Sequence, residues 1–147
     1  MKIRVLWVGK TRNKHYLALQ EDYLQRLSHF AKTEIIEVKD GGGKEAEGQR
    51  IVQHLNPTST VCLLDVEGRS LSSHELSGEI ERWQIAGRKE TTFIIGGADG
   101  VSPQVAKMAT DRISLSFLTF THEMARVILL EQLYRAHTII KGFPYQK

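Results

Sequence analysis

The hydrophobic positions of this chain alternate between short apolar runs and longer stretches with one apolar face. Short runs rich in Val, Ile and Leu are typical of strands, whereas apolar residues that recur every three to four positions are typical of helices. The expected strands cover residues 2–8, 33–38, 60–66, 91–95 and 112–115. The expected helices cover residues 16–30, 45–55, 73–87, 103–109 and 122–140. Because strands and helices alternate throughout, the pattern predicts one α/β domain over residues 1–147, with a mostly parallel sheet and helices on both of its faces.

The last expected helix is apolar in nearly every direction, unlike a helix that lies at a protein surface. Leu129 and Leu133 fall on one of its faces, whereas Ala125 and Ile128 fall on another. Such a helix needs cover on at least two sides, and a second copy of the chain is the simplest partner. The pattern therefore predicts a homodimer, and a central helix within one larger core is the alternative.

The composition is that of an ordinary soluble globular protein. Of the 147 residues, 41% are hydrophobic and 25% are charged, and no apolar run approaches the length of a membrane span. The lone cysteine, Cys62, lies in an apolar run, which favours a buried thiol in a cytoplasmic protein. The six histidines show no metal-ligand spacing, so no metal site is expected.

Positive charge gathers at the two ends of the chain. The net charge is +3, and the basic residues Lys2, Arg4, Lys10, Arg12 and Lys14 all precede the first acidic residue. Basic ends could dock a polyanion if the fold brings them together. A net charge of this size is equally consistent with a solvated basic surface.

Three loops follow expected strands and are the candidates for chemistry, because ligands bind at the carboxyl ends of strands in open parallel sheets. These loops are residues 64–68, 96–100 and 115–121. The glycines of the second loop let backbone approach a ligand closely, although they lack the spacing of a dinucleotide-binding loop. The alternative for each loop is an ordinary tight turn.

The third loop runs directly into the last helix. Thr121 suits the N-cap, because its hydroxyl can accept a hydrogen bond from an amide of the first turn. His122 and Arg126 are four positions apart and therefore share one face near the start of this helix. Their spacing alone fits surface residues as well as residues of a site.

Several motifs occur together and in order along the chain. They are Val8-Gly9-Lys10, Ile95-Gly96-Gly97 with Gly100, the run Leu-Ser-Phe-Leu-Thr-Phe-Thr-His at 115–122, Arg126-Val127, the run Glu-Gln-Leu-Tyr-Arg-Ala at 131–136, and Pro144-Tyr145. Together with the chain length they resemble the RlmH family, and the resemblance covers essentially the whole chain. Its members are SPOUT-class methyltransferases that use S-adenosylmethionine to methylate ring nitrogen N3 of a pseudouridine in large-subunit (23S) ribosomal RNA.

The resemblance implies a trefoil-knotted α/β fold, a homodimer, and a substrate that is ribosomal RNA, free or within the large subunit or ribosome. It also implies a set of residues that hold the cofactor: Leu64, Gly96, Leu115, Ser116, Phe117, Leu118, Thr119 and Phe120.

Three further residues are implied to lie near the substrate. His122 is the candidate general base, because a histidine side chain ordinarily titrates near pH 6.5. Arg126 would stabilise charge that builds on a ring carbonyl. The tail would reach the site through Tyr145. Members of the family usually read Pro-Tyr-His there, whereas this chain has Gln146 after the tyrosine, and an amide cannot titrate.

Two interpretations from other classes remain open at this point. A ribosome-associated factor that binds RNA without chemistry would also account for the basic ends. A nucleotide-binding domain is suggested only by the glycines at the strand ends. Calorimetry with S-adenosylmethionine separates both from a methyltransferase.

Overall fold

The computed structural model describes residues 1–145 and contains a five-stranded sheet in the order β2-β1-β4-β3-β5, with every strand pair parallel. The strands are β1 (Lys2–Val8), β2 (Thr33–Val38), β3 (Thr60–Ser70), β4 (Glu90–Ile95) and β5 (Asp111–Ser114). The helices are α1 (Lys14–Leu27), α2 (Gly43–Val52), α3 (Ser73–Ile85), α4 (Pro103–Met108) and α5 (His122–Lys141). The predicted α/β fold with a parallel sheet is confirmed.

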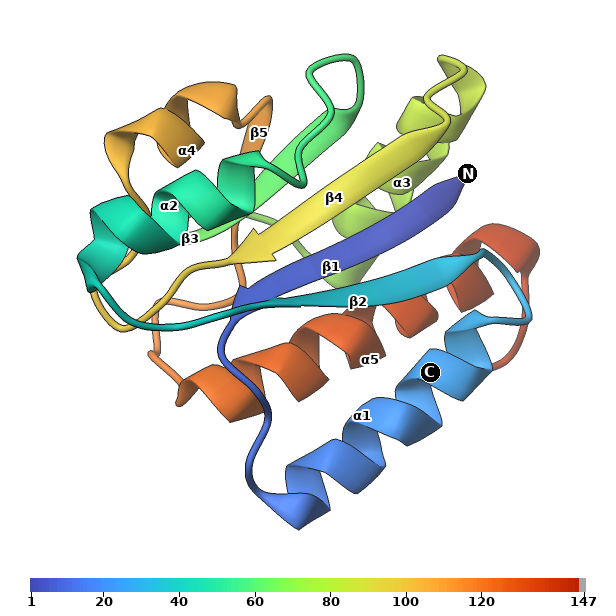
Figure 1. The fold of residues 1–147 in the computed structure, drawn as a ribbon. Helices are drawn as coiled ribbons and strands as arrows, with labels where there is room; N and C mark the ends of the chain where they lie inside the picture. Colours follow the sequence, from blue (N-terminus) through green and yellow to red (C-terminus); the bar gives the residue numbers. More distant parts are fainter. Residues whose placement is uncertain (146–147) are drawn as a thin grey trace.

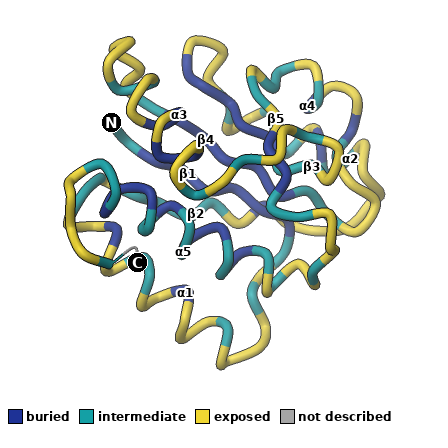
Figure 2. The backbone as a smooth tube through the Cα atoms, turned by 180° about the vertical axis from the view of Figure 1, so that it is seen from behind, coloured by how far each residue is buried: buried dark blue, intermediate teal, exposed yellow. Residues whose placement is uncertain are grey.

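Helices cover both faces of the sheet (Figure 1). On one face α5 packs against both α1 and α3, and on the other face α2 packs against α4. The larger apolar core lies under the first group and includes Trp7, Phe93 and Leu130. The smaller core lies under the second group and includes Leu6 and Ile94. Neighbouring residues of β1 and β4 thus point to opposite faces, as in a strand that is buried on both sides (Figure 2).

Most element boundaries agree with the sequence prediction to within a few residues. α1 ends at Leu27 rather than near residue 30, because the chain tightens into a turn in which the Phe30 amide donates to the Leu27 carbonyl at 2.9 Å. α2 begins at Gly43, two residues before the expected start at residue 45. β3 continues to Ser70 instead of ending near residue 66.

The extra length of β3 comes from an irregularity beside β5. Leu64 and Arg69 both lie opposite Ile113, so residues 65–68 loop out of the ladder. At Gly68 a Cβ would lie 2.8 Å from backbone atoms of β5. Any larger residue there would push the two strands apart, so this glycine permits the excursion.

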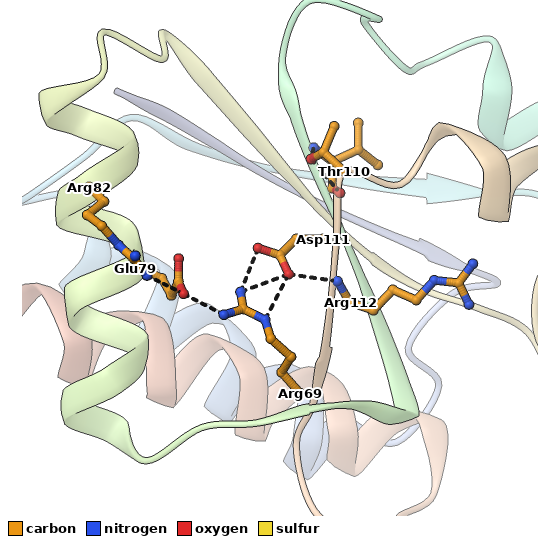
Figure 3. A network of polar contacts seen from close by, with 7 residues as sticks. Arg69, Glu79, Arg82, Thr110, Asp111 and Arg112 are labelled. Carbon is orange, nitrogen blue, oxygen red and sulfur yellow. Dashed lines mark hydrogen bonds and ion pairs between the residues drawn. The ribbon is translucent and has the colours of Figure 1, made fainter.

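A network of ion pairs connects this part of β3 to α3 and β5 (Figure 3). Arg69 donates to Glu79 on α3 at 2.6 Å and to the two oxygens of Asp111 on β5 at 2.8 and 2.7 Å. Arg82 on α3 pairs with the same Glu79 carboxylate. These two carboxylates raise the pKa of Arg69 above its ordinary value. We call Arg69, Glu79, Arg82 and Asp111 the Arg69 clamp; it ties α3, the end of β3 and the start of β5 together.

Helix α5 is covered mainly by its own chain. Leu129 and Leu133 are buried in the larger core, and Ala125 and Ile128 are half-buried. The helix is apolar in many directions because it lies between α1, α3 and the sheet. It is therefore the central helix that was the alternative, and it gives no support of its own to a homodimer, which stays a prediction.

Three smaller expectations have different outcomes. Cys62 is fully buried in β3, and burial raises the pKa of its thiol above the ordinary value, so its burial is confirmed. Among the helices of residues 1–145, none combines the length and the hydrophobicity that crossing a bilayer requires. The trefoil knot implied by the resemblance stays a prediction.

Candidate functional site

A cavity of about 610 Å³ opens at the carboxyl edge of the sheet, between the ends of β3 and β4 and the loop that joins β5 to α5. This volume lies within the range of about 300–1,000 Å³ that is usual for small-molecule sites. The cavity is lined by residues 63–66, 95–101, 106, 112, 115, 116, 118–120, 122 and 125. The three loops that the sequence indicated are therefore brought together around one cavity.

Seven of the eight residues that the resemblance assigned to the cofactor line this cavity, namely Leu64, Gly96, Leu115, Ser116, Leu118, Thr119 and Phe120. Phe117 does not line it and is 81% exposed. The hydroxyl of Ser116 accepts a hydrogen bond from the Leu118 amide at 3.0 Å, so the chain turns tightly at this point. The turn leaves the Phe117 ring in solvent. Contact between the seven and a cofactor stays a prediction.

Gly96 serves the shape of its own loop. The sequence suggested that the glycines of this loop let backbone approach a ligand closely. In the structure, a Cβ there would lie 2.8 Å from Cγ1 of Val101 and 3.0 Å from the carbonyl carbon of Gly100. Glycine is therefore needed because the loop folds back on itself, and a larger residue would open the loop before it met a ligand.

Polar groups of both signs stand beside the apolar walls. Arg112 donates to Asp65 at 3.4 Å, and the other oxygen of Asp65 accepts from the Glu67 amide at 3.0 Å. The second contact holds the aspartate at the start of the β3 excursion. Asp99 contributes another carboxylate from the loop after β4. The cavity thus offers one guanidinium and two carboxylates beside the hydroxyls of Ser116 and Thr119, the imidazole of His122 and apolar walls.

His122 is the first residue of α5 and lines the cavity as an exposed side chain. Thr121 caps the helix as expected, because its hydroxyl accepts from the Met124 amide at 3.3 Å. The cap fixes the start of the helix and with it the position of the imidazole. His122 is the one predicted substrate-side residue that the structure brings to the cavity.

Arg126 does not line the cavity of its own chain, and its expected role near the substrate stays a prediction. Its side chain is buried beneath the segment that follows β1. It donates to the Val8 carbonyl at 2.7 Å and to the Thr11 hydroxyl at 2.9 Å, and its guanidinium lies 4.8 Å from the centre of the Trp7 ring. Burial lowers the pKa of Arg126 from its ordinary value, but a guanidinium stays charged in a protein. Arg126 is a support for the chain after β1.

Tyr145 packs against the second half of α5, away from His122. Its ring packs edge-on against Tyr134 at 4.8 Å, and the guanidinium of Arg135 lies 5.0 Å from its centre. Burial and the neighbouring Tyr23 hydroxyl raise the pKa of Tyr145 to about 12. Tyr134 lies 12 residues after His122, about 18 Å along the helix, so Tyr145 does not reach the cavity of its own chain. Gln146 lies outside the described residues.

Sequence reasoning missed the polar groups of the cavity. Asp65, Asp99 and Arg112 sit in or beside the strand-end loops, and that position was the available signal. It also missed Glu123, whose carboxylate accepts from the backbone amides of Arg12 and Asn13 at 3.1 and 2.9 Å. These bonds join residues that are 111 and 110 positions apart, which no local pattern encodes.

A parallel α/β fold with a ligand-sized cavity at the carboxyl ends of its strands places the chain among α/β proteins that bind a small molecule there. Residues 1–146 match the family model described as "Predicted SPOUT methyltransferase". The chain therefore belongs to the SPOUT methyltransferase family.

Two relatives agree with this assignment, and one solved structure shares the fold. The chain is 41% identical over 159 aligned residues to the Ribosomal RNA large subunit methyltransferase H of Enterococcus faecalis, and the match covers 100% of both proteins. A protein of the same name from Porphyromonas gingivalis is 41% identical over 154 residues, covering 99% of this chain and 98% of the relative. The crystal structure of a probable rRNA-methyltransferase from Porphyromonas gingivalis is similar in fold, with a TM-score of 0.54 and 12% identity over 95% of this chain and 69% of that one.

Proposed function

We propose that this protein uses S-adenosylmethionine to methylate N3 of a pseudouridine in large-subunit ribosomal RNA, in the cytoplasm. The observation that carries the proposal is the identity of 41%, over the full length of both proteins, with a relative named Ribosomal RNA large subunit methyltransferase H. Membership of the SPOUT methyltransferase family and a ligand-sized cavity at the carboxyl edge of the sheet support it.

The residues of the cavity fit S-adenosylmethionine. Leu64, Leu115 and Phe120 offer apolar walls for the purine, and the backbone of the glycine loop offers hydrogen bonds to its edge. Arg112 and Asp65 offer one charge of each sign, which suits a ligand end that carries both a carboxylate and an ammonium group. When bound, the cofactor supplies a methyl group on a cationic sulfur, which keeps the bonding electrons as the methyl group leaves.

His122 is the general base in this proposal. The pseudouridine N3 must give up its proton as it bonds to the methyl group. The exposed imidazole at the cavity wall is placed to accept that proton, directly or through one water. The products are the N3-methylated pseudouridine, S-adenosylhomocysteine and a protonated His122. Positioning of the nucleotide against the cavity supplies much of the remaining acceleration.

A homodimer gives Tyr145 a route to the site. Within one chain the length of α5 separates this phenol from the cavity, so any action of Tyr145 on a substrate comes from a second copy. Phe117 and Leu118 are 81% and 74% exposed at the cavity loop, and such apolar groups are typical of a surface that another chain covers. The proposed assembly therefore builds each site from two copies.

Mass spectrometry of ribosomal RNA from cells that lack the gene tests the activity. One methyl group on a large-subunit pseudouridine should be missing, and the purified protein should restore it with S-adenosylmethionine. The His122→Ala variant should lower the rate about 10²–10⁴-fold, as expected for loss of a general base, while calorimetry still detects cofactor binding. His74→Ala, at an exposed position on α3, is the matched control. A protein that binds the RNA but restores no methyl group would be the RNA-binding factor instead.

Mixing two inactive variants tests the composite site. His122→Ala and Tyr145→Ala should each be inactive alone, because each removes one contribution to both sites of a dimer. After subunit exchange, the mixed dimer contains one intact site and should regain part of the activity. No recovery from variants that do form mixed dimers would place Tyr145 outside the site.

A further inference from the structure

A basic loop lies beside the cavity and is not used by the proposed chemistry. It comprises residues 9–14, which connect β1 to α1 and include the first residue of α1, and it crosses the start of α5 (Figure 1). Lys10, Arg12 and Lys14 are exposed. In the part of the chain that the structure describes, none of these three forms an ion pair with a carboxylate. The loop therefore presents three cations to solvent, none with an ion-pair partner among residues 1–145.

The backbone of this loop is held by carboxylates. Glu123 accepts from the amides of Arg12 and Asn13 at 3.1 and 2.9 Å. Glu37 accepts from the amide of Thr11 at 3.3 Å and from the Trp7 indole at 3.1 Å. The two nearby acids thus bind backbone and indole N–H groups, which leaves the basic side chains of the loop free.

A second layer supports the loop from below. Arg126 binds the Val8 carbonyl at the end of β1 and the hydroxyl of Thr11. That hydroxyl donates in turn to Gln20 of α1 at 2.9 Å, and Gln20 is itself buried. With Thr11 turned inward, Lys10 and Arg12 occupy the alternate positions that face solvent. The loop is fixed in place before any ligand arrives.

The position of the loop relates it to the substrate. Glu123, which holds the loop, directly follows His122, which lines the cavity. We propose that residues 9–14 form a docking loop in which Lys10, Arg12 and Lys14 bind the phosphate backbone of the ribosomal RNA next to the target nucleotide. This inference rests on the proposed function and identifies the surface that holds its substrate. A preformed row of cations suits the regular negative charge of a nucleic acid backbone.

The salt dependence of RNA binding tests the docking loop. The variant Lys10→Gln, Arg12→Gln, Lys14→Gln keeps every backbone amide that holds the loop. Its affinity for a fragment of large-subunit ribosomal RNA should fall about tenfold or more at low salt. The slope of log K against log salt should become shallower by about 2, because each phosphate contact on a single strand contributes about 0.7. Calorimetry with S-adenosylmethionine should give an unchanged affinity, which separates loss of docking from loss of folding.

A matched control removes the same charge at the opposite edge of the sheet. Lys32, Arg88 and Lys89 are exposed just before β2 and β4, at the amino ends of the strands. The variant Lys32→Gln, Arg88→Gln, Lys89→Gln should leave both the RNA affinity and the salt slope unchanged. Equal losses in the two triple variants would show a general effect of net charge and overturn the docking loop.

The remaining outcomes separate this inference from the proposed function. If the wild-type protein methylates the RNA and the docking-loop variant binds it with an unchanged slope, the loop is overturned and the function stands. If the variant loses affinity for whole subunits but not for protein-free RNA, the loop docks on an acidic ribosomal protein and the proposal is overturned. If the wild-type protein neither binds nor methylates ribosomal RNA, the function and the loop fall together.

Discussion

Two arginines hold the segments that border the cavity, and they do so in opposite ways. Arg69 has a half-exposed side chain and pairs with the carboxylates of Glu79 and Asp111 (Figure 3). Arg126 is 3% exposed and donates to a backbone carbonyl and to the hydroxyl of Thr11. Its Nε atom has no hydrogen-bond partner among residues 1–145. The first arginine is neutralised where it sits, whereas the second stays a buried cation with neutral partners.

The two arginines show that one region is neutral overall and the other is positively charged. In the Arg69 clamp two cations meet two carboxylates, so the cluster is balanced and serves the fold. Around Arg126 the carboxylates of Glu37 and Glu123 are engaged by N–H groups, so the docking loop keeps its positive charge. A network whose acids hold backbone amides rather than basic side chains is suited to an anionic partner.

Replacing Arg126 should have the largest effect. Arg126→Met removes two charge-assisted hydrogen bonds and leaves the Val8 carbonyl without this donor. Relief from burying a charge offsets part of the loss, so the free energy of unfolding should fall by about 2 kcal/mol. Urea denaturation measures this change. Because the docking loop loses its support, the KM for RNA should rise while the affinity for S-adenosylmethionine changes little.

Arg126→Lys sharpens this prediction, because a lysine keeps the positive charge but cannot reach both acceptors as a guanidinium does. It should recover part of the stability and part of the RNA affinity. If both variants lose the maximal rate with an unchanged KM for RNA, then Arg126 acts on the reaction and not through the docking loop.

Replacing Arg69 should have a smaller effect and a different character. Arg69→Met removes the link between α3 and β5 and leaves the buried Glu79 with only Arg82 as an ion-pair partner in the clamp. The free energy of unfolding should fall by about 1–2 kcal/mol. The salt slope of RNA binding should stay unchanged, since the clamp carries no surplus charge. Thermal unfolding and the binding assay described above check the two parts.

Arg82→Met is the control for the Arg69 clamp. The side chain of Arg82 is 70% exposed, and exposed ion pairs contribute about 0–1 kcal/mol. Its loss should therefore be smaller than that of Arg69→Met. A larger loss would mean that Arg82, not Arg69, holds the clamp together.

The fold was predictable because its signals are local. Alternating apolar runs marked the strands, and Thr121 marked the start of α5. The cavity was predictable because parallel strands end at one edge, which brings loops distant in sequence together. The direction of Phe117 was missed because it depends on a hydrogen bond between Ser116 and Leu118.

The role of Arg126 could not be predicted from its spacing. Residues four apart share a helix face, but the pattern does not reveal which neighbour covers that face. The Val8 carbonyl that Arg126 binds is 118 positions away in the sequence. For Tyr145 the sequence did hold a signal against a place at the cavity, because a 20-residue helix separates it from the cavity loop. The family resemblance nevertheless favoured a role at the site. Long-range contacts and the direction of single side chains need the folded chain.

A second buried basic group on α5, His137, extends the comparison with Arg126. His137 is buried, and its Nδ1 lies 2.8 Å from the Leu133 carbonyl. Burial lowers the pKa of His137, so it is neutral where Arg126 is charged. Below about pH 6.5 the histidine is protonated in the unfolded chain but not in the folded chain. The free energy of unfolding should therefore fall as the pH drops from 6.5 toward the lowered pKa of His137, by at most about 1.4 kcal/mol per pH unit. Urea denaturation between pH 8 and about pH 5 measures this slope.

The His137→Leu variant should flatten this slope, whereas His54→Gln, at an exposed position, should not. The carboxylates whose pKa is lowered, Glu34, Glu75 and Glu123, lose their contribution only at lower pH, so they do not affect the slope in this pH range. An unchanged slope in His137→Leu would mean that this histidine accepts a proton while folded, and that a buried base on α5 can hold charge without the arginine's partners.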